Sequence, residues 1–563
     1  MMADSTSKFS WPARGEWPWA SLVSAAVMLA TCFPYLLGWG LTSPGSYYSG
    51  LLTNPDEHNV YLSLMRQARD GAWLFSDLFT SEPQRGLVLN VLWLKLGILA
   101  RLTHLSLPVV YHIARVGAGW LLLMALYVLA AQVLPSVSAR RAGLLLAALA
   151  SGFGWLFHSG PGQPHPVDFG PGLIMPEAIT FLTLLLNPLF ASSVFLLIVI
   201  YLAAAHAFLS GSVRAALLGG AAALLLGNLH SYDLIPVVAV LAAFLIYLLV
   251  VRRAGGRAVL LALLMGAIAA PSLLYQLWLQ RSGEVSVLVK MVNQPPSPEP
   301  RYLLLGFGLP LLLALVGVVR AVRGGNDWTR LLVLWLLLGF AAVYAPISFQ
   351  RKLVEGLYVP ICLLAVVGLT GWVREERGAR WPRAAVLAAA LVIVASLPSN
   401  LFFLQRGLGD LLTNNVQYAA NLMPPLYLSA DQRAALAYLD AHAGRADLVL
   451  ANSRLASYAP SLAGVRVYLG HWSETLNFAR KLGEYHAFLR AATPDTARET
   501  FVRGRGITYV VFDHTPLAVD ATFDTLYLLP AERAFDPSTT DWLEPAFQQG
   551  SVAIYRVKER MLA

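Results

Sequence analysis

Long apolar runs separated by short polar segments occupy the chain as far as Leu404. The first run covers 19–41, and the others lie at 109–134, 141–158, 188–209, 213–230, 233–251, 258–279, 302–319, 329–348, 353–372 and 383–404. A helix of about 20 apolar residues crosses the hydrocarbon core of a bilayer, so each run is a candidate transmembrane helix. The pattern therefore predicts a polytopic α-helical membrane protein with about 11–12 transmembrane helices.

One further apolar run, over 87–105, is short and is interrupted by Lys95 and Arg101. Charged side chains within a short run disfavour a full crossing of the hydrocarbon core. We therefore predict a re-entrant or surface helix at this position.

The polar segment 42–86 contains an amphipathic pattern. Asn54 is a suitable N-cap and Pro55 a suitable first helical residue, so a helix is predicted over 55–70. Apolar residues recur on one face of it at helical spacing, at Val60, Leu64 and Ala68. Such a helix would lie along a membrane surface.

The pattern changes again near Ser429. From there, helical segments such as SADQRAALAYLDAHAG alternate with short strand-like segments such as ITYVVF and VAIYRV. Alternating helices and strands with the charge content of a soluble fold predict an α/β domain over 429–563. A linker over 405–428 would join it to a transmembrane module over 1–404, and we expect the domain to fold on its own.

The composition excludes an ordinary soluble enzyme. Of the 563 residues, 57% are apolar and only 13% are charged, and the mean hydropathy is +0.59. The formal net charge of +9 does not indicate a nucleic-acid partner, because the arginines gather in short loops at alternate ends of the predicted spans. Basic loops face the cytoplasm, so we expect a multi-pass protein of the inner (plasma) membrane with a cytoplasmic N-terminus. The segment 42–86 and the C-terminal domain are then extracytoplasmic.

Asp56 and Glu57 are the first candidate catalytic residues. Both fall in the first turn of the helix predicted over 55–70. Acidic residues there stabilise the helix dipole, which is one explanation for the pair. The other is that two carboxylates at the external boundary of the membrane act on a membrane-bound substrate, for example as a general base.

An acidic pair on the first external loop of a many-span chain, followed by an amphipathic helix, resembles the GT-C superfamily of membrane glycosyltransferases, in particular a bacterial branch of it. The resemblance implies a GT-C-like transmembrane module. It also implies inverting transfer of a sugar from a polyprenyl-phosphate donor to a lipid, glycan or protein acceptor outside the cytoplasm. In the family, the acid that matches Asp56 activates the acceptor or holds a metal.

The segment MPEAITFLTLLL is similar to the part of the family that carries a second external acid, and it places Glu177 there. Many relatives have Asp at that position. The resemblance implies that Glu57 and Glu177 support Asp56 in catalysis. It further implies a divalent cation, Mg or Mn, held by Asp56 and Glu177.

Arg351 and Lys352, in SFQRKLVEGLYVP, are candidate residues for binding the donor phosphate. Cations are scarce in the predicted external loops, and a guanidinium grips a phosphate through two hydrogen bonds. Glu355, one turn beyond Arg351, would hold that side chain through an intrahelical pair. Snorkelling of both cations to the interface is the alternative explanation. Arg66 and Arg69 are the next candidates for the phosphate.

Three residues are candidates for binding the acceptor: His230, Asp233 and His471. The first two occur in GNLHSYD at an external helix end, and His471 occurs in VYLGHWSETLNFARK of the C-terminal domain. Histidine exchanges protons near neutral pH, which suits a group that contacts a reacting hydroxyl. A packed, hydrogen-bonded residue is the alternative explanation for each of the three.

A non-enzymatic membrane protein is the rival class: a transporter or flippase for lipid-linked saccharides, or an assembly factor. A transporter usually has ionisable residues near the middle of its spans, whereas the predicted spans here are nearly free of charge. The sequence contains no Gly-rich phosphate loop, no GxSxG and no HExxH. The distribution of candidate residues therefore favours surface chemistry by a glycosyltransferase.

Overall fold

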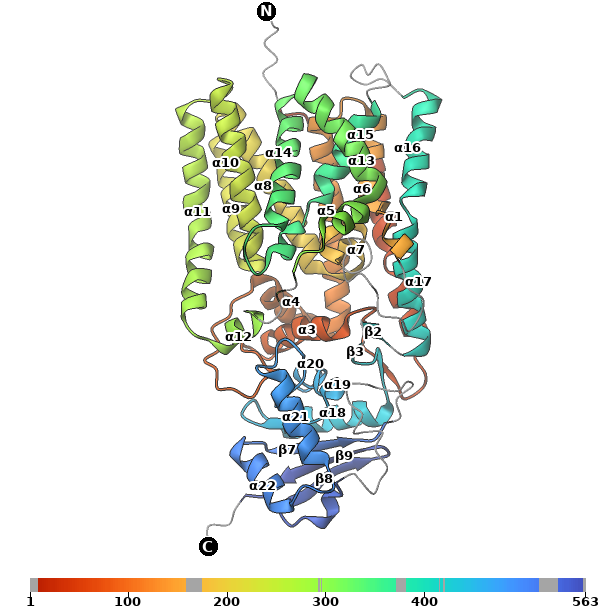
Figure 1. The fold of residues 1–563 in the computed structure, drawn as a ribbon, viewed down its shortest axis with the longest axis vertical. Helices are drawn as coiled ribbons and strands as arrows, with labels where there is room; N and C mark the ends of the chain where they lie inside the picture. The colour runs from red at the N-terminus through yellow and green to blue at the C-terminus, as the bar shows by residue number, and fades with distance from the viewer. Residues whose placement is uncertain are drawn as a thin grey trace, which may run out of the picture. The chain divides into compact units, whose positions relative to one another are not determined.

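The computed structural model describes residues 9–157, 175–291, 294, 296–370, 381–414, 416–418, 421–515 and 535–559. The chain forms two compact units. Unit 1 comprises Met1–Phe33, His112–Trp278 and Gln294–Arg406, and unit 2 comprises Pro34–Tyr111, Leu279–Asn293 and Gly407–Ala563. Figure 1 labels the elements of both.

Unit 1 is built from helices, many of which run side by side (Figure 1). The α-helices that lie wholly or partly in it are α1 (Trp17–Ala30), α2 (Phe33–Gly40), α5 (Leu107–Val133), α6 (Val137–Leu149), α7 (Thr180–Leu186), α8 (Pro188–Ser210), α9 (Val213–Leu229), α10 (Leu234–Val250), α11 (Gly256–Arg281), α13 (Pro300–Gly324), α14 (Asp327–Val343), α15 (Tyr358–Thr370), α16 (Arg383–Ala395) and α17 (Pro398–Thr413). Short 3-10 turns connect several of them: η1 (Arg14–Glu16), η2 (Gly154–Phe157), η3 (Pro176–Ala178), η4 (Ser231–Asp233) and η6 (Gln350–Val354). The turns η3, η4 and η6 carry the candidate residues of this unit.

Eight helical segments among the described residues are long and apolar enough to cross a membrane, which confirms the predicted fold class. They are Arg14–Gly40, Leu107–Val133, Pro188–Ser210, Ser231–Val250, Gly256–Arg281, Pro300–Gly324, Gln350–Thr370 and Arg383–Thr413. A shorter apolar helix, α9, lies between two of them.

The eight long spans are three fewer than the eleven apolar runs, because the run at 213–230 forms only the shorter helix α9 and two other runs end early as helices. The run predicted at 141–158 forms α6, which has 13 residues and stops where Ala150 becomes extended. The backbone N–H of Ser151 then donates to the carbonyl of Ser396. The run at 329–348 forms α14, which has 17 residues and ends three residues before Pro346. An apolar run marks burial in lipid or protein, but not the length of a continuous helix.

Small residues allow α13 and α15 to approach closely within unit 1. A side chain added at Gly317 would overlap the carbonyl of Leu364, and one added at Gly368 would overlap the carbonyl of Leu313. Helices in a membrane associate largely through van der Waals packing, so a contact between backbones stabilises the bundle. This contact positions the start of α15, next to which Glu355 and η6 lie.

Unit 2 contains the helix expected after the first span. The helix α3 covers Pro55–Arg69, within the predicted range 55–70, and it packs against α4 (Val91–Thr103) and α20 (Ala459–Leu462). Its polar positions Asn59 and Gln67 are therefore buried as well as several of its apolar ones. Within unit 2, α3 is largely buried, and Val60 and Leu64 of the predicted apolar face are partly exposed.

The helix α4 occupies the run that was expected not to cross the membrane. Its 13 residues reach only about 20 Å, which is less than the roughly 30 Å of a hydrocarbon core. It packs on α3 through Gly97, where a side chain would overlap the carbonyl of Met65. The rings of Tyr61 and Trp93 stack with centroids 4.7 Å apart.

The C-terminal part of unit 2 contains a five-stranded sheet in the order β6-β5-β7-β9-β8. Its strands are β5 (Leu448–Leu450), β6 (Arg466–Val467), β7 (Tyr509–Asp513), β8 (Leu543–Gln549) and β9 (Val552–Val557). The strand β5 is parallel to β6 and β7, whereas β9 is antiparallel to β7 and β8. The helices of this part are α18 (Ala430–His442), α19 (Ser453–Ala456), α20, α21 (Phe478–Leu489) and α22 (Asp495–Gly504).

Both faces of the sheet are covered. Val449, Tyr509 and Val511 belong to one apolar cluster, whereas Val510 and Phe512 belong to the other. Alternate residues of a strand point to opposite faces, so the nearly continuous apolar pattern of ITYVVF reports a strand buried on both sides. The remaining elements of unit 2 are β1 (Tyr47–Tyr48) paired with β4 (Tyr427–Leu428), β2 (Gln417–Tyr418) paired with β3 (Asn421–Leu422), α12 (Val285–Leu288), η5 (Val289–Met291) and η9 (Pro537–Thr539).

Candidate functional site

The first group of candidate residues lies in unit 2, where Asp56 and Glu57 face His471. Asp56 is the second residue of α3 and is only 3% exposed, and the ring of His471 is fully buried. The Nε2 atom of His471 lies 3.6 Å from Asp56 Oδ2 and 3.9 Å from Glu57 Oε1. The fold thus brings together two acids and a histidine that are far apart in the sequence.

The backbone determines which ring nitrogen of His471 carries the proton. Its Nδ1 accepts hydrogen bonds from the backbone N–H groups of Ser473 and Glu474, at 3.1 and 3.2 Å. An acceptor nitrogen is unprotonated, so the proton of the neutral ring is on Nε2 and points toward the carboxylate of Asp56. Burial lowers the pKa of His471 in spite of the negative charge of Glu57, which keeps the ring neutral.

Burial raises the pKa of Asp56 to about 6, and hydrogen bonds from the backbone oppose that shift. One of them is donated by the N–H of Glu57 to Asp56 Oδ1 at 2.9 Å. A carboxylate with a pKa near the working pH is suited to accept a proton in a transition state.

The residue before α3 does not cap the helix in the way that the sequence predicts. The Asn54 side chain makes no cap hydrogen bond, and the φ of Asn54 is 48°. The carbonyl of Asn54 instead accepts a hydrogen bond from Nδ1 of His58 at 2.9 Å.

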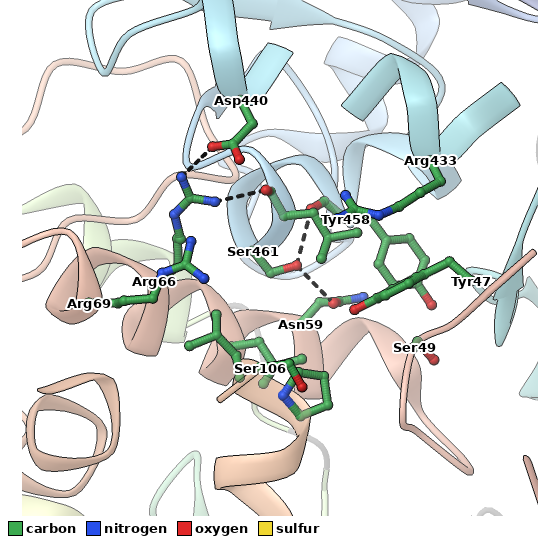
Figure 2. A pocket seen from close by; sticks show the side chains of 14 residues that line it. Tyr47, Ser49, Asn59, Arg66, Arg69, Ser106, Arg433, Asp440, Tyr458 and Ser461 are labelled. Atoms are coloured by element: carbon green, nitrogen blue, oxygen red, sulfur yellow. Dashed lines mark hydrogen bonds and ion pairs between the residues drawn. The ribbon is translucent and has the colours of Figure 1, made fainter. Parts of the chain in front are cut away.

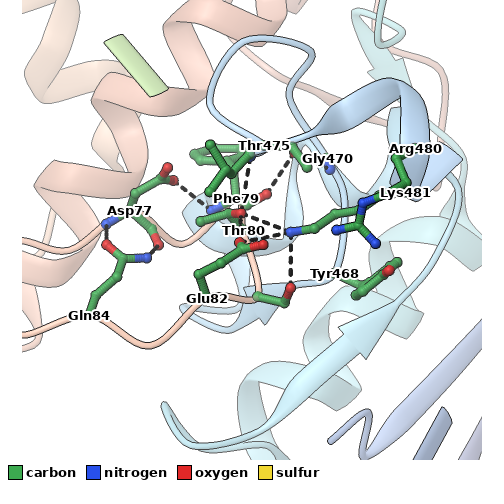
Figure 3. Close-up of polar contacts among 12 residues, drawn as sticks. Asp77, Phe79, Thr80, Glu82, Gln84, Tyr468, Gly470, Thr475, Arg480 and Lys481 are labelled. Atoms are coloured by element: carbon green, nitrogen blue, oxygen red, sulfur yellow. Dashed lines mark hydrogen bonds and ion pairs between the residues drawn. The ribbon is translucent and has the colours of Figure 1, made fainter. Parts of the chain in front are cut away.

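A network behind the acids holds the segment that carries His471 (Figure 3). The hydroxyl of Thr475 donates to the carbonyl of Phe79 at 2.7 Å and accepts from the N–H of Gly470 at 3.0 Å. The buried ammonium of Lys481 donates to Thr80, Ser81 and Glu82 at 2.8–3.0 Å. Sequence reasoning missed this network, because the partners lie in separate segments and are common surface residue types.

The second group lies in unit 1, where η6 contacts both η3 and η4. Arg351 Nε is 3.9 Å from Glu177 Oε1, so the predicted phosphate-binding residue is next to the predicted second acid. The Nδ1 atom of His230 is 2.8 Å from Asp233 Oδ2 and 2.7 Å from Glu355 Oε2.

Glu355 of this second group differs in position from what the sequence suggested. Glu355 does not pair with Arg351 but points to His230, because η6 ends at Val354, directly before Glu355, and Gly356 follows with a φ of 75°. The ammonium of Lys352 lies 5.8 Å from the ring centroid of Tyr232. The sequence signal for Glu355 was an acid directly before an apolar span.

The other phosphate candidates line a cavity of about 170 Å³ in unit 2 (Figure 2). Arg66 uses its guanidinium for protein acceptors: it donates to Asp70 at 2.6 Å, to Asp440 at 2.5 Å and to the carbonyl of Leu462 at 2.8 Å. Arg69 lies 3.6 Å from Asp70. These contacts show Arg66 linking α3 to α18 and α20.

The site at Asp56 offers oxygen atoms, which a Mg or Mn ion prefers as ligands. The carboxylates of Asp56 and Glu57 are oxygen donors of that kind. His471 does not fit as a ligand, because its Nε2 carries the proton while Nδ1 accepts from the backbone. Glu177, the other predicted ion ligand, belongs to unit 1.

No family model and no curated protein sequence matches the chain. Solved structures do match it in fold. The archaeal oligosaccharyltransferase AglB from Archaeoglobus fulgidus aligns at a TM-score of 0.50 and 12% identity, over 88% of this chain and 69% of AglB. ArnT from Cupriavidus metallidurans aligns at 0.51 and 14% identity, over 97% of this chain and 98% of ArnT.

The mycobacterial arabinofuranosyltransferase AftD aligns at a TM-score of 0.56 and 15% identity, over 98% of this chain. The chain has the GT-C fold. It spans 40% of the length of AftD, but nearly the whole of ArnT. Two of the solved structures of GT-C proteins hold a lipid phosphate: AglB with a dolichol-phosphate and an inhibitory peptide, and ArnT with undecaprenyl phosphate.

Proposed function

We propose that this protein is an integral-membrane glycosyltransferase that moves a sugar from a polyprenyl-phosphate donor to an extracytoplasmic acceptor with inversion. The observation that carries the proposal is the buried carboxylate of Asp56 at the start of α3. Its pKa is raised to about 6, and the N–H of a neutral His471 faces it. The lipid phosphates bound by the GT-C proteins AglB and ArnT support the choice of donor class.

In the proposed reaction, Asp56 accepts the proton of the acceptor hydroxyl while the hydroxyl oxygen forms a bond to the anomeric carbon of the sugar. The bond from that carbon to the phosphate oxygen breaks, and its electron pair leaves with the polyprenyl phosphate. A single displacement of this kind inverts the anomeric configuration. His471 directs its Nε2–H toward the Asp56 carboxylate from 3.6 Å, and Glu57 keeps a second negative charge at the site.

We assign donor binding to unit 1. Arg351 offers a buried Nε without a hydrogen-bond partner among the described residues, and such a donor suits a phosphate oxygen. Glu177 orients the guanidinium from 3.9 Å. Lys352 adds a second positive charge, which stabilises the phosphate as it leaves.

The oxygen donors of Asp56 and Glu57 could hold a divalent ion, which would supply positive charge for an acceptor oxygen. With or without an ion, the two side chains place negative charge where the acceptor proton is removed. Adding a chelator to the transfer assay measures the dependence on an ion.

Incubation of the purified full chain with labelled polyprenyl-phosphate sugars and candidate acceptors tests the proposal. We expect a glycosylated acceptor with wild-type protein and at least a hundredfold slower transfer with Asp56→Asn. Asp541→Asn, which changes an exposed Asp of the same unit, is the matched control and should transfer normally. Full activity of Asp56→Asn would remove the assignment of the base.

The transporter alternative gains one observation from the structure. Arg115 lies within α5 and is fully buried, so the spans are not entirely free of charge. It donates to the hydroxyl of Thr31 and the carbonyl of Leu184, both at 2.8 Å, and these contacts explain it as a link between helices. Uptake of lipid-linked sugar into vesicles without any glycosylated product would favour the transporter.

A further inference from the structure

His230, Asp233 and Glu355 form a compact cluster of potential metal ligands in unit 1. One nitrogen or oxygen atom from each lies within 4.8 Å of the others, and all three residues are buried. The turn between α9 and α10 supplies His230 and Asp233, and the residue that follows η6 supplies Glu355. Asp233 Oδ2 and Glu355 Oε2 approach the same ring atom, His230 Nδ1.

The cluster contains more acceptor atoms than donors. Asp233 Oδ1 and Glu355 Oε1 are buried, and neither atom has a hydrogen-bond partner among the residues that the structure describes. Buried polar atoms are nearly always satisfied, and two buried carboxylates cannot be balanced by one imidazole. A doubly charged cation would balance both carboxylates and supply the missing partner for their oxygens.

The surroundings of His230 suit a ligand. The hydroxyl of Tyr232 is hydrogen-bonded to Nε2, on the far side of the ring from the carboxylates. A metal-binding histidine commonly uses its other nitrogen for such a contact, which orients the ring. When Nε2 donates to Tyr232, the lone pair of Nδ1 faces Asp233 and Glu355.

We propose that His230, Asp233 and Glu355 bind one divalent transition-metal ion, Mn²⁺ or Zn²⁺. One imidazole nitrogen with two carboxylate oxygens suits these ions better than Mg²⁺ or Ca²⁺, which prefer oxygen alone. Ligand bonds of about 2.0–2.2 Å require the three side chains to move slightly apart from their present contacts of 2.7–2.8 Å. Three protein ligands leave at least one position open for a water or an anionic group. This site does not depend on the proposed glycosyl transfer, because ion binding is measured without any sugar.

The test uses the purified full chain in detergent, stripped with a chelator and dialysed against Mn²⁺. Electron paramagnetic resonance counts the bound ion, and Zn²⁺ is added as a competitor. We expect one Mn²⁺ per chain, displaced by one Zn²⁺, and at least a tenfold higher dissociation constant in Glu355→Gln and in His230→Gln. Asp327→Asn changes another buried acid of unit 1 and should bind the ion as wild type does. Absence of stoichiometric Mn²⁺ and Zn²⁺ in the wild type, or unchanged affinity in Glu355→Gln, overturns the proposal.

Thermal unfolding of the wild-type protein gives a second test, which does not require the ligand variants to fold. Thermal unfolding of the wild type should shift to higher temperature when Mn²⁺ is added, because an ion that binds only the folded chain stabilises it. Tyr232→Phe keeps all three ligands and removes only the hydroxyl that holds the ring, so its Mn²⁺ affinity should fall by roughly tenfold. If a shared proton rather than an ion links the two carboxylates, Mn²⁺ will not change the melting temperature, and the proposal is then wrong.

Discussion

The chemistry proposed at Asp56 depends on burial of a single carboxylate. Residues in the first turn of an exposed helix ionise easily, because the helix dipole and water both favour the charged form. Asp56 is buried, and removal of water outweighs the backbone hydrogen bonds that favour its charge.

The rate of transfer should fall on the acid side of a pKa of about 6. A general base acts in its ionised form, so kcat/KM should decrease as the pH drops through about 6 and level off above 7. The measurement is the pH profile of transfer from pH 5 to 8 under conditions where the chain stays folded. An acid limb below pH 5 would mean that the base titrates like an exposed carboxylate and is not the buried Asp56.

Replacement of Asp56 should make the fold more stable near neutral pH. A raised pKa means that the folded chain holds this proton more tightly than the unfolded chain does. The associated stability is present below the unfolded pKa of 3.8 and is lost as the pH rises through about 6. At pH 7.5 the buried charge then costs about 3 kcal/mol, since each pKa unit corresponds to about 1.4 kcal/mol.

The Asn variant removes that cost. Thermal unfolding in detergent should show Asp56→Asn with the higher melting temperature at pH 7.5, an advantage roughly halved at pH 5 and nearly gone as the pH approaches 3.8. Asp541→Asn again serves as the control. Equal melting temperatures of wild type and Asp56→Asn at pH 7.5 would show that the carboxylate is solvated.

Arg351→Lys should weaken use of the donor although the charge is retained. A lysine has no planar fork and cannot supply the buried Nε donor. We expect about a tenfold rise in KM for the lipid-phosphate sugar, equivalent to about 1.4 kcal/mol, and a larger rise for Arg351→Ala. Arg301→Lys, at an exposed arginine of the same unit, should leave the donor KM unchanged. If the acceptor KM changes instead, Arg351 does not bind the donor phosphate.

At the scale of elements, the position of Asp56 is determined by the helices that enclose α3. The helix α4 packs on one side through Gly97, and α20 packs on the other, where the hydroxyl of Ser461 donates to Asn59 at 3.1 Å. An amphipathic pattern identifies α3 as a helix with one apolar face. It does not reveal that the polar face is also covered, because the covering residues lie about 400 positions away.

Gly97→Ala should destabilise unit 2. The added methyl group would overlap the carbonyl of Met65 and the methyl group of Ala68, so α4 must move away from α3. Overpacking of this kind costs about 1–3 kcal/mol. The melting temperature should fall, and transfer activity should fall with it because Asp56 shifts. Gly117→Ala, in open space on α5, is the matched control and should leave both unchanged.

At the scale of the whole molecule, the chain contains two units that bury their apolar side chains in different ways. Unit 1 is dominated by apolar helices that satisfy their own backbone hydrogen bonds, as a bilayer requires. Unit 2 combines the first-loop helices with a sheet whose two faces are both buried. The similarity to AftD, ArnT and AglB at 12–15% identity shows that very different sequences meet the requirements of the GT-C fold.

The C-terminal segment expressed alone from Met423 should be soluble and should unfold cooperatively. The buried residues of its two apolar clusters all come from 428–554, and only the partly buried Tyr47 is contributed by the first loop. Circular dichroism during thermal unfolding should show helix and strand lost in one transition. Persistent aggregation would indicate that burial by α3 and β1 is needed, and that 429–563 is not a separable domain.

The sequence by itself determined the class of the protein. Apolar runs of membrane length, arginines at alternate span ends and the change of pattern near Ser429 are local properties, and each follows from composition over a short window. The acid pair was identified in the same way, because Asp56 and Glu57 sit at the start of a helix whose signals are contiguous in the chain.

Only the tertiary structure decided which side chains face one another. The partner of Asp56 is His471, and the partner of His230 is Glu355, at separations that no local pattern encodes. Protonation also depends on that packing: Asp56 has a pKa near 6 because distant residues exclude water, and the proton of His471 is on Nε2 because two backbone N–H groups occupy Nδ1. Burial and hydrogen bonding of a titratable group are properties of the assembled fold, and a linear sequence specifies them only through the fold.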